Sequence, residues 1–321
     1  MHMKTVYDHI KDNNRKTALL VVLFPLTFVA LVFLLVWAAV ALTSNPGDPV
    51  MPIVWATTGT VAIPVAIACL VWLGISWAFG DSIMLSSADA HEIQDNNPEY
   101  KQIFRSVENV ALAAGLPTPR VYIIEDDSLN AFATGRSPKD ASVALTRGII
   151  KKLDRLELEG VIAHEMAHIG NRDIRLDMMM ITGIGVTVFM ADIVWRMILS
   201  SNSGRDDKNK GQMVAILVAV WLAFAVFNWI ITPLLRMAVS RKREFAADAT
   251  GAFITRNPRA LASALNKITC NPRVKVLDGR KSMAAMCIAD PRAKSALAEF
   301  TGSLFATHPP VAERVKRLED M

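Results

Sequence analysis

The chain has 321 residues, of which 52% are apolar and 20% are charged. This charged fraction is low for a soluble protein, so the composition favours a membrane protein. The net charge is only +5 and the basic residues are spread along the chain, a pattern that does not predict nucleic-acid binding. Three cysteines at wide spacings, without a CxxC pair, indicate neither a disulfide framework nor a thiolate metal site.

Two long uncharged segments come first, residues 17–42 and 50–80, and each is long enough to cross a bilayer as a helix. The linker at residues 43–49 is short, polar and turn-rich, so the two segments predict a helical hairpin. Basic residues precede the first segment, whereas the linker has none. By the positive-inside rule, this asymmetry predicts a cytoplasmic N-terminus and a cytoplasmic stretch after the second segment.

A polar stretch of mixed composition follows, and its patterns predict a small α+β region. The turn at residues 136–140 favours a hairpin of the two strands that flank it. His91 and Glu92 begin a stretch that leads to Asp95, and we interpret them as surface residues. The expected elements are a helix at residues 97–114, strands at residues 120–124, 130–135 and 141–146, and a helix from Leu153 onward.

A second pair of apolar segments lies after this region. Residues 212–235 carry no charge, whereas residues 178–199 contain Asp192 and Arg196, four positions apart on one helical face and placed to pair. We expect a second membrane hairpin and about four transmembrane helices; the alternative is a hairpin that only dips into the bilayer. The predicted parts are a transmembrane hairpin at residues 1–80, a cytosolic part at 81–175, the second membrane hairpin at 176–235 and a cytosolic helical part at 236–321.

The helix from Leu153 carries the motif His164-Glu165-Met166-Ala167-His168. Imidazoles four positions apart on a helix have Cβ atoms about 5–6 Å apart, so both can reach one zinc ion at about 2.0–2.1 Å. Glu165 projects beside the metal rather than onto it, where it can take a proton from a water molecule. The motif predicts one Zn²⁺ per chain and a general base at Glu165.

A third ligand is needed, and two residues are candidates. Glu244 is the better one, because it lies four positions before Asp248 in a helical pattern. In that arrangement Glu244 binds the metal while Asp248 accepts the spare N–H of a ligand histidine. His308 is the other candidate. Binding also requires His164 and Glu244 on the same side of the membrane, so the two apolar segments between them must both cross or both fail to cross.

Four motifs in this order resemble the HtpX family of membrane zinc metalloproteases, which is gluzincin-like and related to the Ste-type CAAX prenyl proteases. They are NAFATG from Asn130, HEMAHIGNRD from His164, SRKREFAADATGA from Ser240 and THPPVAERVKRL from Thr307. The resemblance covers nearly the whole chain and departs from the family pattern at no catalytic position. It implies a mainly α-helical membrane protein with a small α+β zincin-like catalytic domain.

The resemblance also implies the roles of residues and the setting. It makes Glu244 the third zinc ligand, maps His308 and Arg314 to positions near the reacting carbonyl, and maps Asn130 to substrate binding. It implies a multi-pass protein of the bacterial cytoplasmic (inner) membrane with a cytosolic active site. Its partners would be the lipid bilayer and polypeptide substrates, namely misfolded or damaged membrane proteins in stress-linked quality control.

The segment from Asn130 to Gly135 predicts how a substrate is held. It has strand character, lies upstream of the metal helix and ends in a glycine before a proline-containing turn. An extended peptide can add to such a strand through backbone hydrogen bonds, a mode that reads little side-chain sequence. The alternative is a buried core strand with Phe132 packed inward. The predicted substrate-binding residues are Asn130, Ala131, Phe132, Ala133 and Gly135.

Other functional classes fit the sequence less well. A site-2-type intramembrane protease pairs HExxH with an LDG motif, and residues 277–279 read LDG, but in a charged setting. A Ste-type prenyl-protein protease would carry more membrane helices. A proteolytically inactive chaperone or scaffold would lack Glu165 or a ligand, and all are present. The interpretation as a transporter would be based only on the charged residues Asp192 and Arg196 in an apolar segment.

Overall fold

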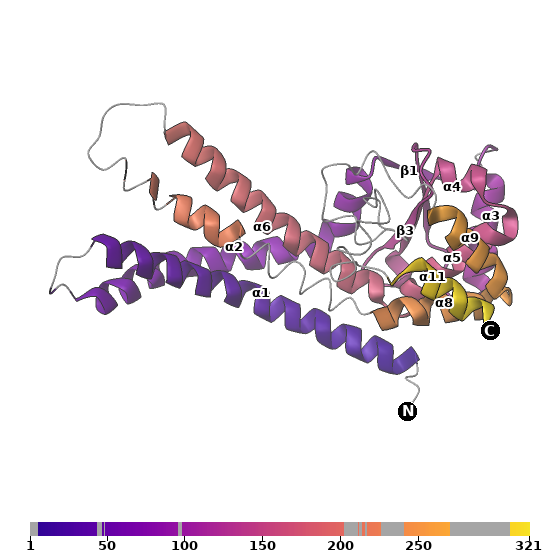
Figure 1. Ribbon diagram of the computed structural model, residues 1–321, viewed down its shortest axis with the longest axis horizontal. Helices are drawn as coiled ribbons and strands as arrows, with labels where there is room; N and C mark the ends of the chain where they lie inside the picture. Colours follow the sequence, from indigo (N-terminus) through magenta and orange to yellow (C-terminus); the bar gives the residue numbers. More distant parts are fainter. Residues whose placement is uncertain are drawn as a thin grey trace. The chain divides into compact units, whose positions relative to one another are not determined.

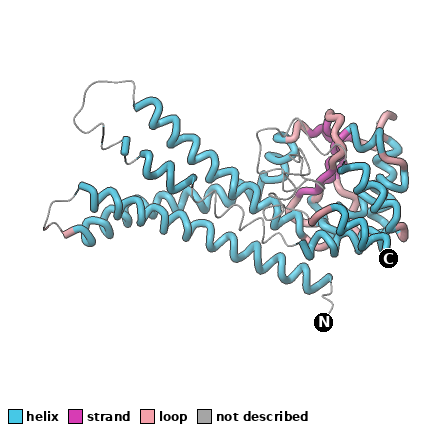
Figure 2. Tube along the Cα trace, viewed as in Figure 1, coloured by secondary structure: helices cyan, strands magenta, loops and turns pink. Residues whose placement is uncertain are grey.

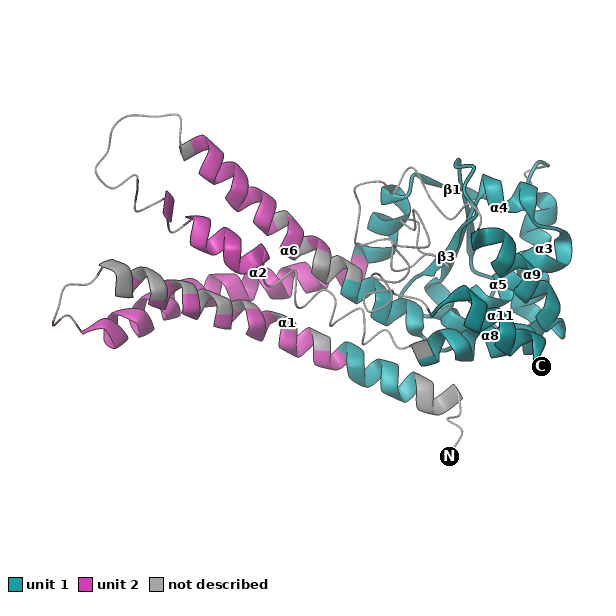
Figure 3. Ribbon diagram, viewed as in Figure 1, with its two compact units in different colours: residues 1–17, 79–181, 235–321 teal, residues 18–78, 182–234 magenta. Residues whose placement is uncertain are grey.

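The computed structural model describes residues 6–43, 47, 49–95, 98–201, 211, 214–215, 217–225, 241–269 and 309–321. Within these ranges the chain is mostly helical and contains one four-stranded sheet (Figure 2). It forms two compact units. Unit 1 comprises Met1–Thr17, Phe79–Ile181 and Leu235–Met321, and unit 2 comprises Ala18–Ala78 and Thr182–Leu234 (Figure 3).

Three long helices contribute residues to both units: α1 (Val6–Thr43), α2 (Val50–Ser87) and α6 (Asp173–Ser201). The helices α1 and α2 contain the first two predicted apolar segments and extend them into their polar flanks. Among the described residues, α2 is the one helix long and apolar enough to cross a membrane. In α6, Arg196 Nε lies 2.8 Å from Asp192 Oδ2, which confirms the expected pair. The predicted segment at residues 212–235 is described only in part.

The sheet belongs to unit 1 and has the strand order β1-β2-β4-β3. Its strands are β1 (Ala90–Ile93), β2 (Arg120–Ile124), β3 (Ala131–Thr134) and β4 (Ser142–Thr146). The strands β3 and β4 pair antiparallel, which confirms the predicted hairpin, and a short 3-10 turn, η1 (Pro138–Asp140), lies between them. The strand β2 pairs parallel to β4 and antiparallel to β1.

Two features of the sheet were not predicted. The strand β1 has four residues and exposes His91 and Glu92, as interpreted from the sequence, so it shows no apolar run. Its strand conformation comes from pairing with β2. The parallel pairing of β2 with β4 joins segments that no local turn connects. Both features arise from contacts between distant parts of the chain.

The central helix of unit 1 is α5 (Arg155–Gly170), which carries the metal motif (Figure 1). Asp154 and Glu157 fix its first turn through a reciprocal capping box. Eleven of its sixteen residues are buried, because it packs against β3 and against several helices at once. Those helices are α3 (Lys101–Ala113), α8 (Arg241–Thr255) and α9 (Pro258–Thr269). The short α4 (Arg147–Lys152) precedes α5, and α11 (Val311–Glu319) packs on α8 and α9.

Two glycines allow close helix crossings along α5. A Cβ at Gly251 of α8 would lie 3.0 Å from His164 N, so glycine lets α8 approach the α5 backbone at the first motif histidine. On the α9 side, a Cβ at Gly160 of α5 would lie 3.2 Å from Leu261 N. The crossing at Gly251 therefore sets how close the side chains of α8, which include Glu244, come to the motif. The crossing at Gly160 has no such effect, because α9 carries no predicted site residue.

We expect Gly251→Val and Gly160→Val both to lower the melting temperature, because overpacking a tight crossing costs about 1–3 kcal/mol. Only Gly251→Val should also lower metal binding, since it moves α8, which carries Glu244, away from α5. Thermal unfolding and metal content of the two purified proteins provide the comparison. A Gly251→Val protein with the metal content of Gly160→Val would contradict this role of the crossing.

Candidate metal centre

The donor atoms of His164, His168 and Glu244 all lie within 4.8 Å of one another. The two Nε2 atoms are 3.1 Å apart, and carboxylate oxygens of Glu244 lie 3.8 Å from His164 Nε2 and 3.6 Å from His168 Nε2. In a tetrahedral zinc site with ligands at about 2.0–2.1 Å, neighbouring donors are about 3.3 Å apart. The three donors therefore fit around one metal ion.

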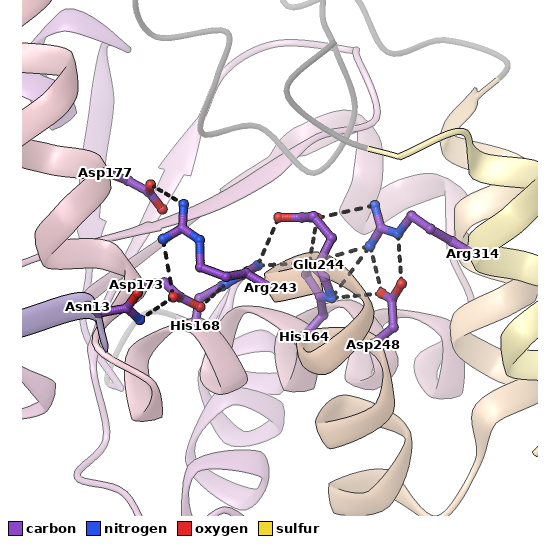
Figure 4. Close-up of polar contacts among 9 residues, drawn as sticks. All are labelled: Asn13, His164, His168, Asp173, Asp177, Arg243, Glu244, Asp248 and Arg314. Atoms are coloured by element: carbon purple, nitrogen blue, oxygen red, sulfur yellow. Dashed lines mark hydrogen bonds and ion pairs between the residues drawn. The ribbon is translucent and has the colours of Figure 1, made fainter. Parts of the chain in front are cut away.

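Each imidazole directs Nε2 toward this point because a carboxylate holds its Nδ1. Asp248 Oδ1, from α8, lies 3.0 Å from His164 Nδ1, and Asp173 Oδ2, from the start of α6, lies 2.8 Å from His168 Nδ1 (Figure 4). A proton on Nδ1 that is donated to a carboxylate leaves Nε2 with its lone pair, the form that binds a metal. The carboxylates thus set the ring orientation and the tautomer together.

The carboxylate beside His164 is held by Arg314 of α11. The guanidinium donates from Nε and Nη2 to the two oxygens of Asp248, at 2.8 and 2.7 Å, and the arginine side chain has no exposed surface. Its Nη2 also lies 3.4 Å from His164 Nε2, and its Nη1 lies 3.7 Å from Glu244 Oε2. The last described helix therefore brings a positive charge to the centre.

The carboxylate beside His168 is held by Arg243 of α8, which donates to it through one nitrogen and to a second carboxylate through another. Its Nη1 donates to Asp173 Oδ1 at 3.2 Å, and its Nη2 donates to Asp177 Oδ1 at 3.0 Å (Figure 4). Burial would raise the pKa of Asp173, but the hydrogen bond to His168 and the charge of Arg243 lower it. Asp173 therefore stays ionised beside the ring that it orients.

The carboxylates give the centre a strong preference for positive charge. Burial alone would lower the pKa of His168, but its hydrogen bond to Asp173 and the charges of Glu244 and Glu165 raise it to about 10. Burial would likewise raise the pKa of Asp248, but the charge and hydrogen bonds of Arg314 lower it to about 2. A divalent cation among the donors meets the same electrostatic demand.

Of the other residues predicted to take part in catalysis, the structure describes Glu165 but not His308. Glu165 is buried on α5 next to His164, and its charge helps to raise the pKa values of both His168 and Arg314. Its carboxylate therefore lies within interaction range of the donor set. His308 and the LDG sequence at residues 277–279 lie outside the described residues.

The predicted substrate strand is β3, which forms an edge of the described sheet. Ala131 and Ala133 belong to the core that β3 shares with α5, whereas Phe132 is buried outside that core cluster. Asn130 Oδ1 accepts a hydrogen bond from Ala131 N at 3.0 Å. Gly135 ends the strand with φ of 134°, and a Cβ there would lie 2.6 Å from Asp140 O, so this turn requires glycine.

Asp173 and Arg243 were not predicted from the sequence. Asp173 lies five residues after His168, beyond the end of α5, where helical spacing no longer predicts direction. Arg172, with φ of 59°, bends the chain so that the Asp173 carboxylate returns to the ring of His168. An acidic residue shortly after an HExxH helix is the signal that could have marked it.

Two histidines of an HExxH helix, a carboxylate from a neighbouring helix and a buried glutamate beside them define a metallopeptidase. The sequence model of peptidase family M48 matches residues 97–321. The chain belongs to peptidase family M48. The resemblance to the HtpX proteases is also confirmed, since curated relatives of that name match 96% to 100% of the chain.

Two such relatives indicate the extent of the match. A protease HtpX homolog from Thermoanaerobacter pseudethanolicus is 39% identical over 323 residues, covering 100% of this chain and 99% of its own. One from Bacteroides fragilis is 38% identical over 315 residues, covering 96% of each chain. Among solved structures, the crystal structure of S. mikatae Ste24p covers 97% of this chain and 66% of its own, with 16% identity and a TM-score of 0.44.

Asp173→Asn should weaken metal binding about 10–100-fold, the usual cost of losing the partner that orients a ligand histidine. The matched control is Asp177→Asn, because Asp177 pairs with the same Arg243, whereas Asp173 is the carboxylate that accepts the hydrogen bond from His168 Nδ1. Competition with a chelator measures the metal affinity of both proteins. Equal affinities in the two variants would show that Asp173 does not orient His168.

Proposed function

We propose that this protein is a zinc-dependent endopeptidase of the cytoplasmic membrane. The observation that carries the proposal is the donor set, in which two imidazoles of one buried helix converge with the Glu244 carboxylate of another. Two histidines and a glutamate are a known ligand set of catalytic zinc sites, which keep a fourth position open. Imidazole donors favour zinc over magnesium or calcium, which prefer oxygen ligands.

Glu165 is the general base of this proposal. Zinc at the centre would supply a Lewis acid and make a water molecule acidic enough to lose a proton near neutral pH. The buried carboxylate of Glu165 lies beside His164 on α5 and interacts with His168 and Arg314. We assign it the proton of the attacking water, which it then delivers to the amine nitrogen as the peptide bond breaks.

We assign Arg314 to hold Asp248 against His164, because two of its nitrogens donate to that carboxylate. Its positive charge also lies beside the donor set, where it can stabilise negative charge on the reacting carbonyl oxygen. The corresponding role of His308 stays a prediction.

The strand β3 is the proposed substrate platform. It pairs with β4 on one side and, in the described part of the sheet, lies at the edge. It also packs on α5, so a peptide added along it would run past the helix that carries the donors. Backbone hydrogen bonds would supply most of the affinity, which suits a peptidase that acts on many unfolded chains. The proposed contacts come from Asn130, Ala131, Phe132, Ala133 and Gly135.

The proposed setting is the bacterial inner membrane, crossed several times, with the centre on the cytoplasmic side. The apolar helix α2 and the exposed apolar side chains of α1, among them Leu19, Val22 and Leu34, support this setting. The basic N-terminal flank supports the orientation. We propose misfolded or damaged membrane proteins as substrates, because such chains would share the membrane with the apolar helices of this protein.

Glu165→Gln tests the chemistry. The variant should keep its metal and lose about 10²–10⁴ in the rate of peptide hydrolysis, because an amide cannot act as the general base. Glu244→Ala is the paired variant and should lose metal as well as activity. Zinc content and cleavage of an unfolded model substrate in detergent provide both readouts. Near-normal turnover in Glu165→Gln would refute the assigned role, and full zinc occupancy in Glu244→Ala would refute the third ligand.

Asn130→Ala tests the substrate strand. Loss of one hydrogen bond is worth about 0.5–1.5 kcal/mol, so kcat/KM should fall about two- to tenfold. Zinc content should stay near that of the unmodified protein, whereas the melting temperature should fall slightly, because Asn130 is buried and accepts a hydrogen bond from Ala131 N. Ser128→Ala is the matched control, because Ser128 is also buried and lies just before the strand. Unchanged cleavage by Asn130→Ala, at substrate concentrations well below saturation, would remove the substrate-strand proposal.

A further inference from the structure

One polar side chain of the first helix lies at the metal centre. Asn13 of α1 is 3% exposed, and its amide nitrogen donates to two acceptors of the segment that follows the metal helix. The amide nitrogen lies 2.6 Å from Asp173 Oδ1 (Figure 4). It also lies 3.0 Å from the backbone oxygen of Asn171. An amide group has two N–H donors, so both are used at the junction between α5 and α6.

The two contacts of Asn13 lie on either side of the bend that delivers Asp173 to His168. Asn171 ends α5, Arg172 has its positive φ, and Asp173 begins α6. Asn13 therefore ties the two ends of this bend together. A serine or an aliphatic residue at the same position could not supply both donors.

The contacts of Asp173 explain how the hydrogen bonds of Asn13 affect the orientation of His168. Its Oδ1 accepts from Asn13 and, at 3.2 Å, from Arg243, whereas its Oδ2 lies 2.8 Å from His168 Nδ1. With Oδ1 fixed on two donors, the carboxylate can rotate little, and Oδ2 stays directed at the imidazole. His168 in turn keeps Nε2 directed at the other donors of the centre.

We propose that Asn13 is a positioning residue of the metal centre, acting on the ligand His168 through Asp173. The inference rests on the proposed metal site. It makes the polar start of the first helix part of the machinery that holds the metal. A displacement of that helix would loosen Asp173 and, with it, the orientation of one ligand.

A simpler role for Asn13 would be to anchor α1 to α6 without any effect on the metal. The adjacent residue provides a matched control, because Asn14 Oδ1 accepts from Arg175 Nη1 at 3.4 Å. Asn14 thus joins the same two helices one residue away, but through Arg175 rather than through the carboxylate that holds His168. Loss of an anchor alone would affect Asn13 and Asn14 variants alike.

The experiment compares Asn13→Ala with Asn14→Ala in the full-length protein in detergent, with zinc and a competing chelator. We expect Asn13→Ala to lower zinc affinity about tenfold, the lower end of the range for partners that orient ligands, and Asn14→Ala to leave it unchanged. The Co²⁺-loaded proteins should show a changed visible spectrum only for Asn13→Ala. Asn13→Ser covers the case in which alanine prevents folding, because its hydroxyl keeps one donor of the two, and zinc affinity should fall for this variant as well.

A double-mutant cycle with Asp173→Asn completes the test. If Asn13 acts through Asp173, adding Asn13→Ala to Asp173→Asn should cause little further loss of zinc affinity. Independent, fully additive losses would overturn the proposal, as would unchanged zinc affinity in Asn13→Ala and Asn13→Ser or equal losses in the Asn13 and Asn14 variants. Zinc binding by the unmodified protein and its loss in His168→Ala report separately on the proposed metal site.

Discussion

A buried imidazole presents one nitrogen to a metal only while its other nitrogen is held, and the centre is organised by that constraint. His164 is buried on α5 and His168 is exposed over only 14% of its side chain, so neighbouring side chains provide the groups that orient the rings. The acceptors come from the neighbouring helices as Asp248 and Asp173. A buried carboxylate in turn needs a cation or a donor close by, and one arginine serves each.

The need of each imidazole for a carboxylate, and of each carboxylate for an arginine, explains why unit 1 combines segments from distant parts of the sequence. The ligands occupy α5 and α8, the acceptors occupy α6 and α8, and the cations come from α8 and α11. A small residue allows the closest of these approaches, since Gly251 lets α8 lie against the backbone of α5 at His164. The sheet contributes to the same hydrophobic core through Ala131 and Ala133 of β3, which belong to the core cluster that contains residues of α5.

Local patterns predicted the two histidine donors and made Glu244 the better of two candidates for the third donor, which the family resemblance then selected over His308. HExxH places two imidazoles by helical geometry alone, and Glu244 and Asp248 repeat the same four-residue spacing on their own helix. The β3–β4 hairpin likewise follows from strand and turn signals in adjacent residues. By contrast, the direction of Asp173 depends on the backbone of Arg172, and the contact of Asn13 joins residues 160 positions apart. The strand β1 has no apolar run and depends on β2, so neither β1 nor the contact of Asn13 has a local signature. For Asp173 the only local signal is an acidic residue shortly after the HExxH helix.

The position of Arg314 in the chain has a consequence for biosynthesis. The guanidinium that neutralises Asp248 follows His164 by 150 residues, so translation produces the metal motif long before its last charged partner. Until α11 emerges from the ribosome, Asp248 has no arginine to offset its burial, and the pocket around His164 is electrostatically incomplete. The charge arrangement around the first motif histidine is therefore completed only when the C-terminal helix has been made, after the rest of the donor set is already in the chain.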